Sequence, residues 1–355
     1  MDSIILHNSR ITVALSRDGN RLLAQSVTNL ATGFNWVASG TPLGPSLSQG
    51  GDPADGMETS FTLAGQPLLK TASDAEHLFV AWTRPDGLTL DWTLTSFPGV
   101  SVVAFGASLR NSGEELLTTP PSFGPLSIRL RDGTAPYKVH WVTRYDYRKH
   151  EATLDRAFTL RGGEWNRPDS AGWFVLENTH AQEILFVGIE WESYWQMSLE
   201  RQDSQVLLHY TLEHVRHDLP PNATLAAPRV FLGVSHGDLD DALRDLHDYL
   251  RMYVMAPKLP HTPWVAYDIW GTEAEGVEEG ILAEIPFAAD LGVELFYVDA
   301  SWYDGSCKNG SGDWFTGVGN WQQEDRVKYP RGLASLSHQV HQAGMRFGLW
   351  FCPQM

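Results

Sequence analysis

The pattern of apolar residues changes near residue 236, and this change constrains the fold more than any other feature of the chain. Before it, short alternating runs predict antiparallel strands. The clearest run is 88–94, where three leucines and Trp92 share one face and Thr and Asp share the other. Many such strands without long helices predict a β-sandwich over residues 1–236. Further runs lie at 77–83, 101–109, 184–191, 206–212 and 229–234, and the Gly- and Pro-rich segment 40–56 predicts a long loop.

The pattern after residue 236 first becomes helical. One apolar stripe steps by three and four residues, and Asp238 stands before it as an expected N-cap. The stripe consists of Leu239, Leu243, Leu246, Leu250 and Tyr253. A Pro-rich stretch follows, so residues 237–263 are predicted to be a linking helix and a linker.

From Trp264 the chain alternates predicted strands with predicted helices. The strands lie at 264–270, 294–299 and 346–351, and the helices lie at 275–291 and 332–343. Pro286 predicts either a kink or a shorter first helix. The second and third strands carry apolar runs without alternation, which predicts burial of both faces. Repeated βα units predict a doubly wound sheet or a (β/α)8 barrel. A barrel needs about 250 residues, so residues 264–355 supply either a small open α/β domain or a barrel's first three strands.

Composition excludes several classes of partner. The chain has 355 residues and a net charge of −17, which argues against nucleic acid and anionic membranes. It contains no apolar run long enough to cross a bilayer. Its first residues lack the signature of a secretory signal, and its two cysteines, Cys307 and Cys352, are too few for a disulfide framework. We therefore expect a cytoplasmic protein.

The predicted carboxyl ends of the three late strands carry acids and large aromatic rings. Ligands bind at this edge of parallel α/β folds, where carboxylates accept hydrogen bonds from hydroxyls and rings pack on C–H faces. The residues are Tyr267, Asp268 and Trp270, then Asp299, Trp302 and Tyr303, then Trp350 and Cys352. This set favours a neutral polyol such as a sugar. The alternative, in which the acids cap turns and the tryptophans are core, remains open.

No pattern of cofactor or metal binding is present. His214 and His217 stand three apart in a predicted strand and would point to opposite faces, so they do not predict a metal pair. No phosphate-binding loop, nucleophile elbow or dinucleotide fingerprint follows a strand. We expect neither a cofactor nor a metal.

The segments from residue 264 onward resemble a known family. They read, in order, YDIWG, LGVELFYVDASWY, GNW, KYPRGL, HQAGMRFGLWF and CPQM. This succession resembles the front half of the catalytic barrel in the glycoside hydrolase family 36 α-galactosidases, or melibiases. That family shows Y-N-x-W-E, L-G-x-E-x-F-x-x-D-D-G-W, G-D-W, K-x-P-x-G-L and G-x-x-F-G-L-W-x-E-P-E-M. The resemblance implies a β-supersandwich over 1–236, a linking helix and linker over 237–263, and strands one to three of a (β/α)8 barrel over 264–355.

The resemblance also implies roles for single residues. Asp299 matches the first Asp of D-D-G-W, which contacts substrate hydroxyls in the family, and Trp302 matches its Trp. The remaining matches are Asp268 and Trp270 in the first strand, Trp321 in the G-D-W loop and Trp350 in the third strand. These six residues are the expected substrate-binding set.

The chain departs from the family at five positions. Ala300 stands in place of a second sugar-binding Asp, Ser301 in place of Gly, and Gly271 in place of Glu. Cys352 and Gln354 replace the two Glu of E-P-E. Lost hydroxyl acceptors change sugar discrimination, so these departures bear on galactose specificity more than on the reaction class.

The family is retaining, with an Asp nucleophile on the fourth barrel strand and an Asp acid/base on the sixth. Both positions are expected beyond Met355. The full-length protein is therefore expected to hydrolyse terminal α-galactosides or related α-glycosides of an oligosaccharide, whereas the 355-residue chain alone is expected to be inactive. Three alternatives stay open: a raffinose-synthase-type transglycosylase, a non-catalytic carbohydrate-binding protein, and a protein without a sugar role. The patterns also leave a homo-oligomer open.

Overall fold

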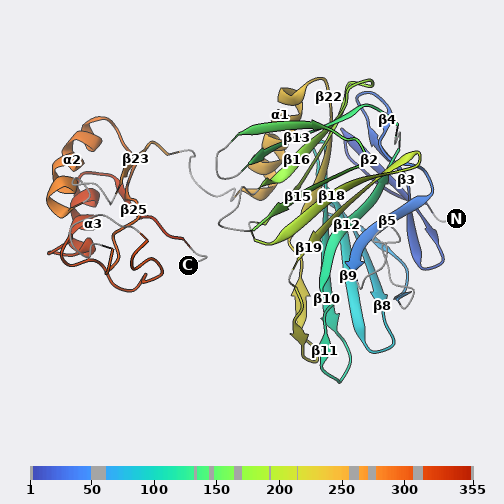
Figure 1. Cartoon of the computed structure of the whole chain (residues 1–355), viewed down its shortest axis with the longest axis horizontal. Helices are drawn as coiled ribbons and strands as arrows, with labels where there is room; N and C mark the ends of the chain where they lie inside the picture. Colours follow the sequence, from blue (N-terminus) through green and yellow to red (C-terminus); the bar gives the residue numbers. More distant parts are fainter. Residues whose placement is uncertain are drawn as a thin grey trace. The chain divides into compact units, whose positions relative to one another are not determined.

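The computed structural model describes residues 3–48, 61–131, 134–143, 148–163, 170–191, 193–213, 215–255, 264–270, 277–306 and 315–352. The chain forms two compact units, Met1–Pro257 and Lys258–Met355. The first is built from large antiparallel sheets and the second from parallel strands and helices (Figure 1). The predicted change from sandwich to β/α structure is confirmed. Among the described residues, no helix is both long and apolar enough to cross a membrane.

The first unit contains two large sheets. The first sheet has the order β1 (Ser3–His7), β2 (Ile11–Asp18), β3 (Arg21–Asn29), β5 (Thr41–Ser48), β12 (Ser122–Leu130), β19 (Gln205–Leu212), β18 (Trp195–Gln202) and β15 (Ala157–Gly162), with β4 (Phe34–Asn35) on β3. The second has the order β14 (Lys149–Thr153), β13 (Tyr137–Thr143), β16 (Ser170–Asn178), β17 (Glu183–Ile189), β22 (Val230–His236), β10 (Val102–Asn111), β9 (Leu88–Ser96), β8 (Glu76–Thr83) and β6 (Thr62–Leu63). In this sheet β21 (Thr224–Ala226) pairs with β10 and β7 (Leu68–Thr71) with β8, and β11 (Leu117–Thr118) and β20 (Asp218–Leu219) form a separate ribbon.

The core of this unit is made by side chains from both sheets. The alternation predicted in β9 is present, because its leucines and Trp92 are at most 1% exposed and belong to this core. The indole of Trp92 donates a hydrogen bond of 2.8 Å to the carbonyl of Pro125, so the core satisfies its polar edge. The largest fully buried side chains include Trp36, Trp82, Trp92, Trp195, Tyr137 and Tyr210.

The loop predicted over 40–56 is wrong in its first half, because residues 41–48 form β5 between β3 and β12. Pro45 has no N–H to donate, and it lies where the register between β5 and β12 shifts. The strand tolerates Pro45 because the pairing of β5 with β12 is irregular at this residue. Residues 49–56 lie outside the described part of the chain.

The predicted helix is α1 (Leu239–Tyr249), which continues as a single π-helical segment, η2 (Leu250–Val254). Asp238 is the N-cap as predicted, and it exchanges hydrogen bonds with Asp241 in a capping box. The buried face of the helix consists of Ala242, Leu246 and Tyr249, which pack on a second cluster that includes Phe186 and Phe231. Of the predicted stripe only Leu246 is buried, and the other members, Leu239, Leu243, Leu250 and Tyr253, are partly buried against the same cluster. The helix therefore covers one face of the second sheet.

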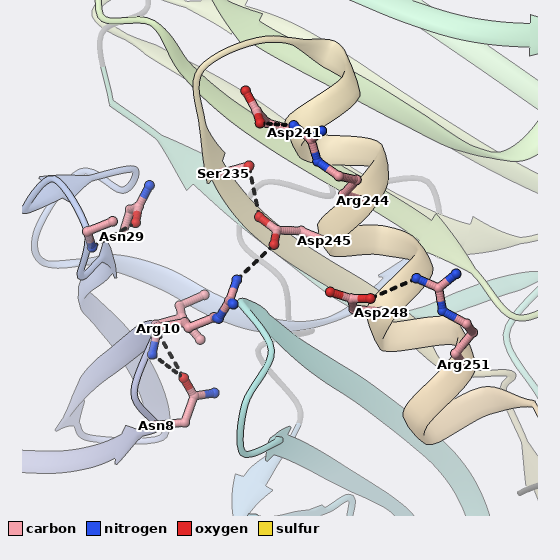
Figure 2. Close-up of polar contacts among 11 residues, drawn as sticks. Asn8, Arg10, Asn29, Ser235, Asp241, Arg244, Asp245, Asp248 and Arg251 are labelled. Carbon is pink, nitrogen blue, oxygen red and sulfur yellow. Dashed lines mark hydrogen bonds and ion pairs between the residues drawn. The ribbon is translucent and has the colours of Figure 1, made fainter.

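A polar contact also holds α1 to the sandwich. Asp245 accepts a hydrogen bond of 2.9 Å from Arg10, which lies in the β1–β2 turn, and one of 2.8 Å from Ser235 at the end of β22 (Figure 2). Asn8 in turn accepts from the backbone N–H of Arg10. The helix is thus joined to strands from both ends of the sequence of this unit.

The second unit has a parallel sheet in the order β23 (Ala266–Ile269), β24 (Leu295–Val298) and β25 (Arg346–Leu349). It is joined by α2 (Glu278–Asp290) and α3 (Leu333–Gln342). The helix α2 continues through Pro286. Helix and strand residues form one apolar cluster, which includes Ile281, Ile285, Phe296, Val298, Leu336 and Val340.

Only one face of this sheet is buried. In β24, Phe296 and Val298 are buried, whereas Leu295 and Tyr297 are half-buried. The side chains of β25 are half-buried or exposed. The expectation that both faces are buried is therefore wrong for the described residues. The apolar pattern of these strands did not separate the helix-covered face from the open face, because both faces carry large side chains.

Candidate functional site

The open face of the β23–β24–β25 sheet arranges its side chains in rows. Because side chains alternate along a strand and the strands are in parallel register, Asp268 lies opposite Tyr297, and Tyr297 lies opposite Gly348. The next row, at the carboxyl ends, contains Trp270, Asp299 and Trp350. The backbone N–H of Asp299 and that of Trp350 extend the ladder there, each through a 2.9 Å bond.

The carboxyl group of Asp268 lies near enough to that of Asp299 to act on it by charge and hydrogen bonding. Asp299 is 9% exposed, whereas Asp268 is exposed. Burial, followed by the charge and the hydrogen bond of Asp268, raises the pKa of Asp299, while a hydrogen bond from the backbone N–H of Ala300 opposes this rise. The pair therefore offers several acceptor oxygens at one end of the sheet, with one carboxyl group held away from water.

Tyr297 supports the pair from the row below. Burial, followed by hydrogen bonding to Asp268 and by the charge of Asp268, raises the pKa of Tyr297 to about 12. The phenol consequently stays protonated at neutral pH and remains a donor. Gly348 makes room for it, since a Cβ on Gly348 would lie 2.9 Å from the Cβ of Tyr297.

Three of the predicted tryptophans form one aromatic group. The rings of Trp302 and Trp321 lie 5.9 Å apart, and those of Trp321 and Trp350 lie 6.0 Å apart. Trp302 is 3% exposed and donates a 2.8 Å hydrogen bond to the carbonyl of Trp350. Trp302 therefore holds the second and third strand ends together, while Trp321 and Trp350 are half-buried.

Trp270 stands apart from this group. It is 43% exposed at the end of β23, in the same row as Asp299. An exposed ring beside a carboxyl pair can pack on the C–H face of a sugar while the acids take its hydroxyls.

The other strand-end residues do not face the same way. Tyr267 turns to the helix side, where its phenol donates a 2.8 Å hydrogen bond to Glu284 of α2. Tyr303 is fully buried, and Ala300 and Cys352 are 2% and 5% exposed. The positions of Ala300 and Cys352 are therefore closed to solvent within the described residues. Four further sequence positions, Cys307, His214, Gly271 and Gln354, lie outside the described residues.

Sequence reasoning missed a buried polar cluster behind Asp299. Ser301 has a φ of 77° and is fully buried. The ammonium of Lys328 donates to its carbonyl and hydroxyl oxygens over 3.1 and 3.0 Å, and Ser306 donates to the same carbonyl over 2.9 Å. Asp325 accepts from the backbone N–H of Lys328. A non-glycine residue at positive φ is strained, and this network holds it in place.

One signal could have identified part of this cluster. The family pattern has Gly where Ser301 stands, and an invariant Gly often marks a left-handed backbone. Lys328 begins the KYPRGL segment, and the resemblance of this segment to the family pattern implies no role for the lysine. Its burial depends on the loop that returns to Ser301, and no local pattern indicates that contact.

A pocket of about 540 Å³ borders the aromatic group. Its lining is mostly polar and includes Trp302, Trp321, Asp304, Gln322, Gln323 and Glu324. Glu324 also accepts a 2.6 Å hydrogen bond from the backbone N–H of Leu333, the first residue of α3. Within the part of the chain that the structure describes, no group of three or more His, Cys, Asp or Glu could hold a metal ion.

Comparisons with known proteins find similar sequences among the α-galactosidases. Residues 224–355 match the sequence profile of the family described as Melibiase. The chain is 25% identical over 299 residues to α-galactosidase 2 of Pediococcus pentosaceus, covering 79% of this chain and 38% of the relative. It is 31% identical over 141 residues to an Escherichia coli α-galactosidase, covering 39% of this chain and 19% of the relative.

Solved structures show the same fold over nearly the whole chain. The glycoside hydrolase family 36 α-galactosidase AgaA from Geobacillus stearothermophilus superposes with a TM-score of 0.75 at 16% identity. The match covers 99% of this chain and 56% of that one. Variants of AgaA have been solved in complex with stachyose and with raffinose. An α-galactosidase from Lactobacillus brevis superposes with a TM-score of 0.72 at 18% identity, covering 99% of this chain and 55% of that one.

The chain thus spans about half the length of these solved structures and 38% of the Pediococcus relative. The fold agrees from the sandwich to the third parallel strand, and the family profile covers the segment that carries the strand-end acids and tryptophans. Residues 224–355 are thus similar in sequence to the melibiase family, and the chain has the fold of the first part of the glycoside hydrolase family 36 α-galactosidase structures.

Proposed function

We propose that this chain is the sugar-recognition part of a retaining glycoside hydrolase that acts on terminal α-galactosides. One observation carries the proposal: Asp268 and Asp299 bring two carboxyl groups to the carboxyl end of the parallel sheet, and the exposed ring of Trp270 stands in the same row as Asp299. Carboxyl oxygens and one open aromatic face match the hydroxyls and C–H face of a neutral hexose. The solved complexes of AgaA variants with stachyose and raffinose support an oligosaccharide as the ligand class.

We assign the pair a binding role rather than a catalytic one. The two carboxyl groups of a retaining glycosidase stand about 5–5.5 Å apart, because the sugar carbon lies between them. Asp268 and Asp299 instead stand on the first two parallel strands, whereas the resemblance puts the nucleophile and the acid/base on the fourth and sixth. We therefore assign Asp299 and Asp268 to substrate hydroxyls and Trp270 to the sugar face.

The catalytic carboxyl groups belong, by resemblance, to the fourth and sixth barrel strands. The described part of this chain has three parallel strands. We expect no glycosidase turnover from residues 1–355 alone, because the nucleophile and the acid/base supply most of the rate.

The experiment is an assay on a panel of nitrophenyl glycosides. It compares the complete protein that carries these residues with residues 1–355 alone. The proposal expects the complete protein to release nitrophenol from the α-galactoside with retained anomeric configuration, and the 355-residue chain to release none. If the complete protein turns over no α-galactoside, the proposal is wrong.

A second candidate is a non-catalytic sugar-binding protein. The departures at Ala300 and Cys352 favour it, because both positions are closed to solvent and offer no hydroxyl acceptor. This candidate expects calorimetric sugar binding by the complete protein without turnover. A third candidate, transglycosylation, differs only in the acceptor. Product analysis with a sugar acceptor in place of water separates it from hydrolysis.

A further inference from the structure

A second pocket lies in the sandwich unit, and none of the strand-end residues lines it. It has a volume of about 640 Å³. Its walls come from the connection between β17 and β18, from the end of β19 and the residues after it, and from β21 with the segment that leads to β22. Trp191 and Tyr194, in the connection from β17 to β18, both line it and are 48% and 43% exposed. Two large rings thus remain in contact with solvent around one concavity, although this unit buries most of its large aromatic side chains.

An ion pair at the wall of this pocket is rigidly positioned. Arg229 donates to one oxygen of Glu190 through two nitrogens, over 2.9 and 2.8 Å. The other oxygen of Glu190 accepts a 2.8 Å hydrogen bond from the phenol of Tyr249, which is fully buried. Burial and the adjacent Glu190 carboxylate raise the pKa of Tyr249 above its ordinary value, so this phenol remains a donor. The hydrogen bond from the buried Tyr249 phenol therefore holds the Glu190 carboxylate on its interior side.

The front of the pair stays open to solvent. The Arg229 side chain is 43% exposed and that of Glu190 is 17% exposed. Carboxylate oxygens have lone pairs beyond those used here, so Glu190 can accept further hydrogen bonds. Glu213 lines the same pocket beside apolar Leu212 and Val215. The pocket thus combines donors and acceptors at fixed positions with two aromatic faces.

We propose that this pocket binds one unit of a neutral saccharide, separately from the strand-end site. Rings would pack on the C–H face of the sugar, while Glu190 and Arg229 would exchange hydrogen bonds with vicinal hydroxyls. A net charge of −17 and the carboxylates in the lining disfavour an anionic ligand. The proposal does not rest on the hydrolase activity, because it needs only the sandwich residues.

The test measures raffinose binding by ligand-observed NMR on the 355-residue chain. An Asp299→Asn background removes an acceptor from the strand-end site, so that the remaining signal reports the sandwich pocket. In this background we expect millimolar binding of raffinose. The further substitution Trp191→Ala should weaken it about 10-fold, as expected for a lost ring contact. Phe79→Ala is the matched control, since Phe79 is 39% exposed on β8 and does not line the pocket, and it should leave the affinity unchanged.

A second variant checks the polar wall. Arg229→Gln should also weaken binding, and its near-ultraviolet spectrum and melting temperature show whether Tyr249 and the fold are retained. The proposal is overturned if the Asp299→Asn chain binds no raffinose at millimolar concentration, or if Trp191→Ala binds as tightly as Phe79→Ala. Neither outcome bears on turnover by the complete protein, so a failure here is distinguishable from a failure of the proposed function.

Discussion

The sandwich core and the open sheet face of the β/α unit use tryptophan in opposite ways. In the sandwich, Trp36, Trp82, Trp92 and Trp195 are at most 2% exposed and fill the space between two sheets. In the β/α unit, Trp270 is 43% exposed, and Trp321 and Trp350 are half-buried at the edge of a sheet whose second face is open. The same side chain stabilises one unit and lines a candidate binding surface in the other. The difference lies in whether a second layer covers the sheet.

This comparison teaches how to separate packing from recognition. A core tryptophan has its ring surrounded and its indole N–H satisfied, as in Trp92. Trp302 belongs to the same class, although it stands in a family motif, since it is 3% exposed and bonded to the Trp350 carbonyl. Among the tryptophans that the structure describes, Trp191 and Trp270 are the most exposed, at 48% and 43%.

The largest expected effect separates the two classes of tryptophan. Trp92→Ala should lower the free energy of unfolding of the sandwich by about 3–5 kcal/mol, because it opens a cavity and leaves the Pro125 carbonyl without its donor. Trp270→Ala should change stability by less than about 0.5 kcal/mol. Urea unfolding of both variants makes the measurement. Equal losses of unfolding free energy would contradict the distinction between core and exposed tryptophans.

The buried lysine of the β/α unit should come next in size. Lys328→Met removes a donor to two oxygens of Ser301 and should cost about 1–3 kcal/mol, because the buried hydroxyl at this strained backbone loses the ammonium and the carbonyl retains the hydrogen bond from Ser306. Arg326→Met is the matched control two residues earlier, where the side chain is 65% exposed. It should cost less than about 0.5 kcal/mol. Thermal unfolding monitored by circular dichroism distinguishes the two. If Lys328→Met leaves the melting temperature unchanged, the cluster does not hold the loop.

A smaller effect is expected where α1 joins the sandwich. Asp245→Asn weakens the contacts with Arg10 and Ser235 and should cost about 0.5–1 kcal/mol at low salt, with a smaller loss at high salt. Asp248→Asn serves as the control, because its pair with Arg251 lies along the helix surface. Denaturant midpoints at two salt concentrations provide the measurement. A salt-independent loss would contradict an electrostatic contact.

The smallest effect is expected for Asp299→Asn, which should raise stability at pH 7 instead of lowering it. Burial raises the pKa of Asp299 above its ordinary 3.8, so the folded chain holds this proton more tightly than the unfolded chain. Stability from this group is therefore present at low pH and is lost as pH rises through the raised pKa. Asp299→Asn keeps an acceptor for the Ala300 N–H and removes the buried charge. The variant should melt slightly higher than the parent at pH 7, with no advantage below pH 3.8. A lower melting temperature at pH 7 would contradict this assignment.

Much of the fold could be predicted because its signals are local. The alternation in β9 and the Asp238 cap of α1 follow from neighbouring residues, and both are present. β5 was missed because its Pro and Gly are local turn signals, whereas its pairing with β3 and β12 is decided by distant strands. Tertiary pairing overrode propensity there.

The sequence predicted which residues stand at the strand ends, but not how deeply each of them is buried. The sequence placed Asp268 and Asp299 at strand ends, and the parallel register brings their carboxyl groups together. Nothing local distinguished the buried Trp302 from the exposed Trp270, since both follow an apolar strand. The contact between Ser301 and Lys328 spans a loop, and its only signal was a Ser at a position where the family has Gly.

The most direct test of the central claim is kcat/KM of the complete protein for an aryl α-galactoside after Asp299→Asn. Loss of a charged acceptor for a substrate hydroxyl should lower kcat/KM by about 10- to 100-fold. An unchanged kcat/KM would contradict the claim that this carboxyl group recognises the sugar.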